Sequence, residues 1–373
     1  MEVVFAVLGL AALVYLVALV RIWYGLGRLA PGMVTRQPPA TVLVAARNEE
    51  KHIAECLDAL EVQDYGGSLE ILVLNDSSTD STAATVERYA ARDPRIRLIN
   101  VPPALDGTAP KKHALTTGLA ASSGELVFVT DADCVVPTSW MSRLASHFTE
   151  DVGLVTGGVF LPEEPGLVAK MRNLDFAAYT FCSAGAMQTG WPLIATAMNL
   201  AYRREAFEEA GGFGRDAAVL SGDDDLLLHA IVRETSWRAA FAYGPSTVVD
   251  TQPVHSLGAF INQRMRWASK AFRYPPGMTA FLAAAFTLYA GLLVGIPLAV
   301  FGVVAPKPVL AAVAVKLFAD ALVVIRGCRL FARTSLLPAY VPAALLHLPY
   351  ILTASIGGAL GLFKWKGRGP GAA

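Results

Sequence analysis

Four short clusters of polar residues stand out in an otherwise apolar chain, because their side chains could bind ions or phosphate or move a proton. In chain order they are Asn75-Asp76, Asp131-Ala132-Asp133, Gly222-Asp223-Asp224-Asp225 and Gln263-Arg264-Met265-Arg266-Trp267. Carboxylates can coordinate a divalent cation or accept a proton from a hydroxyl group. Arginine can clamp phosphate, and tryptophan offers a flat apolar wall to a ring. The clusters together predict a site that binds and reacts.

The pair Asp131 and Asp133 has the spacing of a cation site. The two carboxylates flank a small residue directly after the apolar run Phe128-Val129-Thr130. Alternate residues of a strand point the same way, so both carboxylates could reach one centre. Hard divalent cations prefer such oxygen ligands and can bridge to a diphosphate. The alternative is an ordinary acidic turn, and the presence of the other clusters favours the cation site.

The run Asp223, Asp224 and Asp225 places three like charges on one short segment. Such a run destabilises a fold unless something compensates the charges. The structural alternative is a helix N-terminus, which would stabilise one or two of the carboxylates. Because that alternative leaves the rest unexplained, we expect one carboxylate to take a proton from an acceptor hydroxyl.

The basic and aromatic cluster lies shortly before a second apolar block. Its structural alternative is a belt of basic and aromatic residues at a membrane surface. As a site, Arg266 could hold phosphate while Trp267 packs against a sugar, with Gln263 beside them. His255 precedes the cluster and could be a metal or phosphate ligand, although a single histidine is more often structural.

The segment from about residue 40 to 274 alternates strand-like and helix-like patterns. Strands are predicted at 41–46, 69–74, 97–101 and 125–130, and helices at 49–60, 78–91 and 111–121. This order predicts an α/β fold with a mixed, mostly parallel sheet and helices on both faces. Ligands of such sheets bind beyond the carboxyl ends of the strands, where Arg47, Asp76 and Asp131 fall. We expect Asp76 to bind a base or ribose, with Ser78 or Asp80 as the helix cap.

Several features of the sequence exclude other classes of protein. No Gly-x-Gly-x-x-Gly and no Walker-type lysine motif occurs, which excludes the usual dinucleotide and ATPase modes of binding. The formal net charge is 0, which gives no sign of a nucleic-acid partner. Four scattered cysteines without a Cys-x-x-Cys pair argue against a structural zinc site and indicate reduced thiols.

Apolar segments on both sides of this region predict a membrane protein, since 54% of the 373 residues are apolar and 17% are charged. Residues 1–22 are expected to form an N-terminal anchor, and 38–275 a cytoplasmic domain. The segments 278–305, 308–326 and 335–363 are expected to be transmembrane or re-entrant, with a tight loop at 306–308. Leu167 to Trp191 could be a helix at the lipid surface or a buried helix of the domain.

Two charge patterns bear on the membrane topology. Lys316 and Asp320 are four residues apart on one helical face and could neutralise each other. Three simple spans after the domain would put the basic tail outside, against the preference of positive residues for the cytoplasm. Three prolines interrupt the last apolar stretch, so a broken or re-entrant element stays open. The tail residues concerned are Lys364, Lys366 and Arg368.

Taken together, the clusters resemble glycosyltransferase family 2, whose members have the GT-A fold and use nucleotide sugars. Residues 42–50 look like the family's opening strand and loop. Residues 74–80 are similar to its Asp-Asp-Gly-Ser-x-Asp motif, with Asn75 in place of the first Asp. Residues 111–115 look like Lys-x-x-Ala-Leu, and 131–133 like the metal-binding DxD. Residues 263–267 match the Q-x-x-R-W motif of membrane-embedded members such as cellulose, chitin and hyaluronan synthases and the ceramide glucosyltransferases.

The resemblance implies a role for each matched residue. The base would be Asp224, with Asp223 beside it as the alternative if the alignment is off by one residue. A divalent metal, Mn²⁺ or Mg²⁺, would be held by Asp133, Asp131 and His255. Gln263, Arg266 and Trp267 would bind the acceptor or the diphosphate. The nucleotide sugar would be held by Ala46, Arg47, Glu49, Asp76, Lys111 and Asp131.

The reaction implied is an inverting transfer of a sugar, with UDP as the expected carrier and GDP left open. We expect the acceptor to be a membrane lipid at the cytoplasmic face of a bacterial inner membrane, because processive synthases usually have more spans. A short-chain processive polysaccharide synthase is the first alternative. A non-catalytic membrane scaffold with a decayed transferase domain is the second.

Overall fold

The computed structural model describes residues 2–33, 36–104 and 107–364, so Lys366 and Arg368 of the basic tail lie outside the described residues. The chain divides into two compact units. The sheet unit comprises residues 29–162 and 192–253, and the helical unit the described parts of 1–28, 163–191 and 254–370. The expected domain 38–275 is therefore divided, because 163–191 and 254–275 fold with the apolar helices.

The sheet unit is built on a seven-stranded sheet with the order β3-β2-β1-β4-β8-β6-β9. β1, β2, β3 and β4 are parallel, whereas β8 runs antiparallel to both β4 and β6. This is the mixed, mostly parallel sheet that the sequence predicts. The strands are β1 (Ala40–Ala46), β2 (Leu69–Asn75), β3 (Ile96–Asn100), β4 (Leu126–Asp131), β6 (Val152–Gly157), β8 (Leu200–Arg203) and β9 (Arg238–Ala242).

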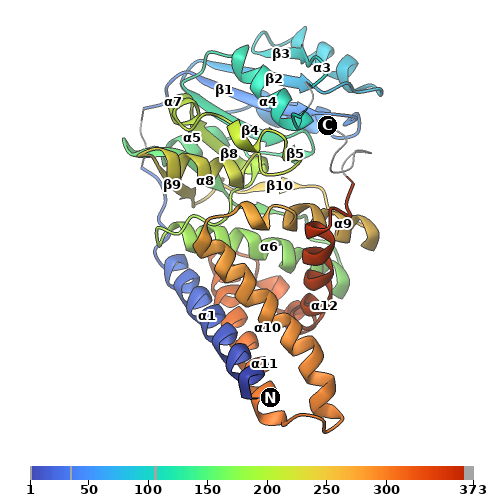
Figure 1. The fold of residues 1–373 in the computed structure, drawn as a ribbon. Helices are drawn as coiled ribbons and strands as arrows, with labels where there is room; N and C mark the ends of the chain where they lie inside the picture. The colour runs from blue at the N-terminus through green and yellow to red at the C-terminus, as the bar shows by residue number, and fades with distance from the viewer. Residues whose placement is uncertain (1, 34–35, 105–106, 365–373) are drawn as a thin grey trace. The chain divides into compact units, whose positions relative to one another are not determined.

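The central strands are buried almost throughout, as expected of parallel strands that are covered on both faces. Figure 1 shows the helices of this unit beside the sheet. They are α2 (Ile53–Glu61), α3 (Thr82–Ala90), α4 (Pro110–Ala120), α5 (Trp140–Ala145), α7 (Arg204–Glu209) and α8 (Asp225–Glu234), with short 3-10 helices η1 (Ala197–Asn199) and η2 (Gly214–Asp216).

A second, three-stranded sheet has the order β5-β10-β7 and lies at the end of β4. β5 (Cys134–Val135) follows Asp133 directly and pairs antiparallel with β10 (Val249–Thr251), while β7 (Val159–Phe160) completes the sheet. Thr251 is the partner of Cys134. The turn that carries Asp133 is therefore held between β4 and a paired strand rather than left as a free loop.

The helical unit contains four helices that are long and apolar enough to cross a membrane. These are α1 (Glu2–Leu26), α10 (Pro276–Val300), α11 (Pro306–Leu330) and the segment 334–359, which consists of η4 (Thr334–Ala339) and α12 (Tyr340–Ala359). The loop expected at 306–308 is wrong, because Pro306 begins α11; proline is favoured in a first helical turn. The other members are α6 (Leu167–Met187), α9 (Leu257–Ala268) and η3 (Ala271–Arg273).

The residues 167–191 fold mainly as α6, which belongs to the helical unit and not to the sheet unit. α6 packs on α1 at two glycines, where a Cβ on Gly25 would lie 1.9 Å from the carbonyl oxygen of Gly185. Only glycine allows this close approach of the two backbones. α6 is thus a largely buried helix that groups with the apolar helices, and its position at a lipid surface stays a prediction.

The predicted pair Lys316–Asp320 forms inside the helical unit, with Nζ and Oδ2 2.7 Å apart. Lys316 also donates to the carbonyl oxygen of Ala344, and Asp320 accepts from the hydroxyl of Tyr15 at 2.6 Å. Each charge thus has an opposite charge and a further hydrogen bond. This is the arrangement in which a buried ion pair is tolerated among apolar helices.

Candidate active site

The carboxylates of the second cluster, Asp131 and Asp133, lie where the sequence predicts, at the carboxyl end of β4. Asp131 is the last residue of that strand, and Asp133 stands in the turn before β5. Lys111, in the first turn of α4, donates to Asp131 with 2.7 Å between Nζ and Oδ1. Proline at position 110 starts α4 and so fixes the position of the lysine that follows it.

The acidic run before α8 reaches the same lysine. Asp223 Oδ2 lies 2.9 Å from Lys111 Nζ, and the Asp223 side chain is 9% exposed. Lys111 therefore pairs with two carboxylates from different parts of the chain. Burial by itself would lower the pKa of Lys111, but Asp131 and Asp223 raise it above its ordinary value. The lysine stays charged at neutral pH and compensates part of the acidic cluster.

Asp224 has a different environment from Asp223. Its side chain caps α8, because Oδ1 accepts from the backbone N–H of Asp225 at 2.7 Å. Oδ2 accepts from the N–H of Ala197 in η1 at 3.3 Å. Gly222 precedes the run with a φ of +85°, a conformation that favours glycine and turns the chain into the helix. The helix N-terminus that was weighed as the alternative is thus present, and it accounts for Asp224 and Asp225.

A second connection holds the acidic run near β4. The hydroxyl of Thr130, next to Asp131, donates to the carbonyl oxygen of Met198 at 2.9 Å. Met198 lies in η1, whose first residue Ala197 donates to Asp224. The end of β4 and the start of α8 are therefore joined on one side by Lys111 and on another by η1. This arrangement brings the carboxylates 131 and 223–224 to one region of the sheet unit.

Two buried thiols lie close enough to these carboxylates for their pKa values to be affected. Burial raises the pKa of Cys56, and the charges of Asp133, Asp131 and Glu49 raise it further. Burial likewise raises the pKa of Cys134, with Asp133 and Asp131 adding to the effect. Three carboxylates from the loops after β1 and β4 thus act on Cys56. Both thiols stay protonated at neutral pH, and neither cysteine forms a disulfide.

The loops after β1 and β2 bind each other through side chains. Arg47 donates to the carbonyl oxygen of Asp76 at 3.2 Å and lies 3.4 Å from its carboxylate. The N–H of Asp76 bonds to the carbonyl oxygen of Ala46, at the end of β1. The predicted donor-binding residues Ala46, Arg47 and Asp76 are therefore brought together at the carboxyl ends of adjacent strands.

Helix α2 starts at Ile53 rather than at residue 49 as predicted, because the loop after β1 is longer. Asn48 has a φ of +54°, and its side chain accepts from Thr79 N–H in the next loop. Glu49 donates its N–H to the Thr82 hydroxyl and accepts from Ile53, the first residue of α2. Periodicity alone assigned these residues to a helix, whereas contacts with the second loop hold them outside it.

Asn75, which replaces an aspartate of the family motif, has a structural role here. Its Nδ2 donates to the Asn100 side chain at 2.8 Å, and its Oδ1 accepts from Ser78 N–H. A carboxylate could not make the first of these bonds to an amide oxygen. Asp80 accepts from the N–H and the hydroxyl of Thr82 at the start of α3, which is the capping task expected of Ser78 or Asp80.

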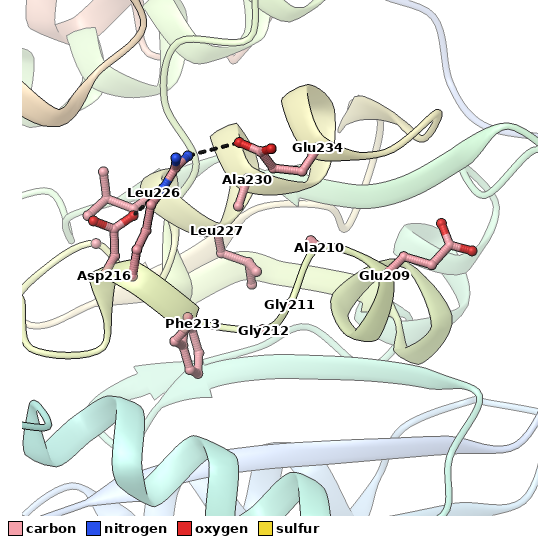
Figure 2. Close-up of a pocket in the computed structure, with 13 residues that line it drawn as sticks. Glu209, Ala210, Gly211, Gly212, Phe213, Asp216, Leu226, Leu227, Ala230 and Glu234 are labelled. Carbon is pink, nitrogen blue, oxygen red and sulfur yellow. Dashed lines mark hydrogen bonds and ion pairs between the residues drawn. The ribbon is translucent and has the colours of Figure 1, made fainter.

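A hollow of about 340 Å³ lies beside α8, as Figure 2 shows. The Gly211–Gly214 turn forms one wall, and the ion pair between Arg215 and Glu234, 2.9 Å apart, closes another. Leu226 and Leu227 line its floor. None of the residues predicted for the site lines this hollow in the described part of the chain, although Gly222 at the start of the acidic run does.

The basic and aromatic cluster lies on α9, in the helical unit together with His255. The buried arginine of this cluster is Arg264, with 1% of its side chain exposed, rather than Arg266. Arg264 donates to Asp175 of α6 and lies 4.3 Å from the centre of the Trp267 ring. Trp267 also packs edge-on against Tyr179. Trp267 is thus held by α6 and by its own helix.

Sequence reasoning missed Asp175 and Arg264 as partners, and Lys111 as the link between two acidic clusters. Asp175 gave one signal, since a charge in the apolar segment 167–191 requires a partner if it is buried. Nothing in the local pattern named Arg264 as that partner, because the two residues are far apart in sequence.

Comparison with curated proteins gives relatives that are named as transferases. An N-acetylglucosaminyltransferase of Bradyrhizobium diazoefficiens is 26% identical over 248 residues, which are 63% of this chain and 49% of that protein. A β-monoglucosyldiacylglycerol synthase of Synechocystis sp. is 25% identical over 239 residues, which are 63% of this chain and 48% of that protein. The chain spans about half the length of the curated relatives it matches.

A solved structure extends the likeness to both units. A mannosyltransferase of Pyrobaculum calidifontis, solved with GDP-Man and Mn²⁺, is 24% identical, with a TM-score of 0.56 over 95% of this chain and 98% of that chain. This likeness shows the fold, which is the GT-A fold that the sequence predicts. The model of a family described as "Glycosyltransferase like family 2" matches residues 38–270. Since that match covers more than half of the sequence, the chain belongs to this glycosyltransferase family.

Proposed function

We propose that the protein transfers a sugar from a nucleotide sugar to a hydroxyl group of a membrane lipid. The observation that carries this proposal is Lys111, which pairs with Asp131 at 2.7 Å and with Asp223 at 2.9 Å. A cation site and a general base must lie close together for such a transfer, and these contacts bring the two acidic clusters into one region. Membership of a glycosyltransferase family supports the same reaction.

The donor would bind at the carboxyl ends of β1, β2 and β4. Arg47 and Asp76 already contact each other there, and the loop of Glu49 leads away from β1. Asp76 would accept hydrogen bonds from the base or the ribose. Lys111 would lie beside the diphosphate. It would stay positively charged there, because its pKa is raised. UDP is the proposed carrier, as the resemblance to the family implies, and GDP stays the alternative.

The donor set of this region fits a hard divalent cation, Mn²⁺ or Mg²⁺. Asp131 and Asp133 are carboxylates two residues apart, and both act on the same thiol of Cys56. No group of three acidic, histidine or cysteine side chains is placed to hold a metal ion in the parts of the chain that are described. Two carboxylates leave coordination positions for diphosphate oxygens, as is usual for metals that bind with a nucleotide. When bound, the cation would offset the negative charge on the departing diphosphate.

His255 is proposed as a further ligand from the resemblance alone, since the described residues form no group of three such side chains that could hold a metal ion. Imidazole is an acceptable ligand for Mn²⁺, and less so for Mg²⁺. A His255→Ala variant that loses Mn²⁺-dependent transfer and keeps Mg²⁺-dependent transfer would support this assignment.

Asp224 is proposed as the base. One oxygen is used by the cap of α8, and the other accepts a long bond of 3.3 Å from Ala197. That second oxygen would take the proton of the acceptor hydroxyl as its oxygen attacks the anomeric carbon, with inversion of configuration. Asp223 is less suited, because its carboxylate already pairs with Lys111 at 2.9 Å.

A lipid acceptor is proposed because the chain carries four helices fit to cross a membrane and because a relative is named as a synthase of glucosyldiacylglycerol. Gln263, Arg266 and Trp267 would bind the acceptor or the diphosphate. The sheet unit is proposed to face the cytoplasm at a bacterial inner membrane, because arginines follow α1 and positive residues prefer the cytoplasmic side.

The test uses membranes that contain the full chain, radiolabelled nucleotide sugars and a total lipid extract. Transfer to an organic-extractable product of fixed size supports the proposal, and the Asp224→Asn variant should lose it. An ethanol-insoluble polymer would instead support the short-chain polysaccharide synthase. Absence of both transfer and hydrolysis across UDP- and GDP-sugars, with Mn²⁺ and with Mg²⁺, would favour the non-catalytic scaffold and overturn the proposal.

A further inference from the structure

The last apolar element of the helical unit, η4 with α12, starts and ends at the same layer of helices. This layer consists of α6 and α9. It lies at one end of the long helices: Gly25 near the end of α1 meets Gly185 of α6, and Gly327 near the end of α11 meets Phe181 of α6. Gly277 at the start of α10 lies near Trp191, just after α6. Figure 1 shows α6 and α9 running across these helices rather than along them.

The element begins at this layer. Ser335 of η4 donates to Glu163 at 2.9 Å, and Arg333 lies 4.0 Å from the same carboxylate. Glu163 stands four residues before the start of α6. The chain thus leaves α11 at the layer of α6 and α9. The arginines 326, 329 and 333, which are expected to face the cytoplasm, lie at this end of α11.

The middle of the element lies far from the layer. The hydroxyl of Tyr340 contacts the carbonyl oxygen of Leu317, and the carbonyl oxygen of Ala344 accepts from Lys316 at 2.8 Å. Leu317 precedes the end of α11 by 13 residues, which corresponds to about 20 Å of helix. His347 packs against Tyr289, which is 13 residues into α10 and hence at a similar depth.

The end of the element returns to the layer. Tyr350 packs edge-on against Phe260 of α9, with the ring centres 5.3 Å apart. Gly358 touches the backbone of Met265, where an added Cβ would lie 2.5 Å from the carbonyl oxygen. Lys364 exchanges two hydrogen bonds with the Asn262 side chain, at 2.6 and 2.8 Å. Both ends of the element are therefore bonded to residues at the same end of the helical unit.

We propose that η4 and α12 form a re-entrant element, which enters the bilayer to about 20 Å of a core roughly 30 Å thick and returns to its side of entry. Val341, Leu345 and Leu346 near its deepest point are exposed and would face lipid acyl chains. A 3-10 segment and a proline-containing helix can do this because the carbonyl of Ala344 and the hydroxyl of Tyr340 bond to α11. Composition alone counts this segment as a fourth span.

The proposal explains the charge pattern that three simple spans leave unexplained. With α12 re-entrant, Lys364 lies on the side of Arg326 and Arg329, and all of them would face the cytoplasm. The chain leaves α1 for the sheet unit at the same layer, after Arg28. Residue 364 and the sheet unit would then lie on the same side of the membrane. The inference rests on the proposed embedding of the helical unit in a bilayer.

The test measures on which side of the membrane residue 364 lies. Single cysteines are placed at Lys364, at Val303 between α10 and α11, at Thr334 at the start of η4, and at Lys51 in the sheet unit, all of which are exposed. Inverted and right-side-out vesicles that contain the full chain are treated with a membrane-impermeant maleimide. The parent protein, with its own four cysteines, gives the background.

The Lys364→Cys variant is expected to react in the same vesicles as Lys51→Cys and Thr334→Cys, while Val303→Cys reacts only in the opposite vesicles. Reaction of Lys364→Cys together with Val303→Cys would show that α12 crosses the membrane and would overturn the proposal. If Val303→Cys reacts in the same vesicles as Lys51→Cys, α10 and α11 do not cross the membrane. The proposed embedding of the helical unit in a bilayer would then be wrong. Neither readout depends on sugar transfer.

A fusion of the full chain to a reporter covers the case in which Lys364→Cys does not insert. Green fluorescent protein after residue 373 should fluoresce, because it folds only in the cytoplasm, and alkaline phosphatase at the same place should be inactive. An active phosphatase fusion with a dark fluorescent fusion would contradict the re-entrant arrangement.

Discussion

The ammonium group of Lys111 lies 2.9 Å from a carboxylate oxygen of Asp223. The same group lies 2.7 Å from Asp131. One lysine on α4 thus ties the end of a central strand to the start of α8. The proposed active site depends on this contact, because it is one of the two links, with η1, that bring the acidic clusters together.

Replacing Lys111 by Met should destabilise the sheet unit, since Asp131 and Asp223 would be left close together without compensation. Breaking a buried pair in this way costs on the order of 3 kcal/mol. Thermal unfolding in detergent measures the loss, with Lys51→Ala on the surface as the control. The raised pKa of Lys111 keeps the ion pair intact below the ordinary lysine pKa of 10.5, and the contribution is lost only as the pH rises through the raised value. Stability from this pair should therefore not change between pH 7 and pH 9.

Replacing Asp224 by Asn should reduce sugar transfer by about 10²- to 10⁴-fold, as expected for loss of a general base. The amide oxygen of Asn can still cap α8, so stability and donor binding should change little. Asp225→Asn is the matched control one residue away. Measurement of kcat and of UDP binding separates the two effects. Equal activity of Asp224→Asn and the parent would assign the base to another residue, with Asp223 the first to test.

The thiols of Cys56 and Cys134 should be unreactive toward maleimides at pH 8 in the folded protein. Burial and the nearby carboxylates raise both pKa values, so the thiolate fraction at that pH is negligible. Both should react after unfolding in denaturant. Rapid modification of either thiol in the native protein, seen by mass spectrometry, would mean that the region around Asp131 and Asp133 is open.

Within the helical unit, Lys316→Met and Asp320→Asn should each destabilise the protein more than the double variant does. A single change leaves one charge without its partner, at a cost of about 3 to 5 kcal/mol, while the double change removes both charges. The aggregation temperature of purified protein in detergent reports the difference. A double variant that is as unstable as the sum of the singles would argue against the pair.

Arg264 and Arg266 should respond differently to substitution by alanine. Arg264 is buried against Asp175 and Trp267, so its removal leaves a buried carboxylate unpaired and should cost about 3 kcal/mol. Arg266→Ala should instead reduce transfer, if Arg266 binds phosphate as proposed. A stable and active Arg264→Ala variant would contradict the structural role of the pair.

The sequence by itself determined the features that depend on local pattern. The alternation of apolar runs predicts β1, β2, β3 and β4, because side chains of a strand repeat every two residues. The polar clusters at the strand ends follow from the rule that parallel strands present their carboxyl ends at one edge. The pair Lys316–Asp320 could be predicted because residues four apart share a helical face.

Only the tertiary structure decided which distant residues meet. Periodicity cannot show that Lys111 pairs with Asp223, that Arg264 of α9 reaches Asp175 of α6, or that residues 163–191 fold with the apolar helices. The return of α12 to the layer of α6 and α9 is of the same kind, since an apolar run looks alike whether it crosses a membrane or turns back. Contacts between segments far apart in the chain are selected by packing and charge compensation over the whole fold, and no local pattern records them.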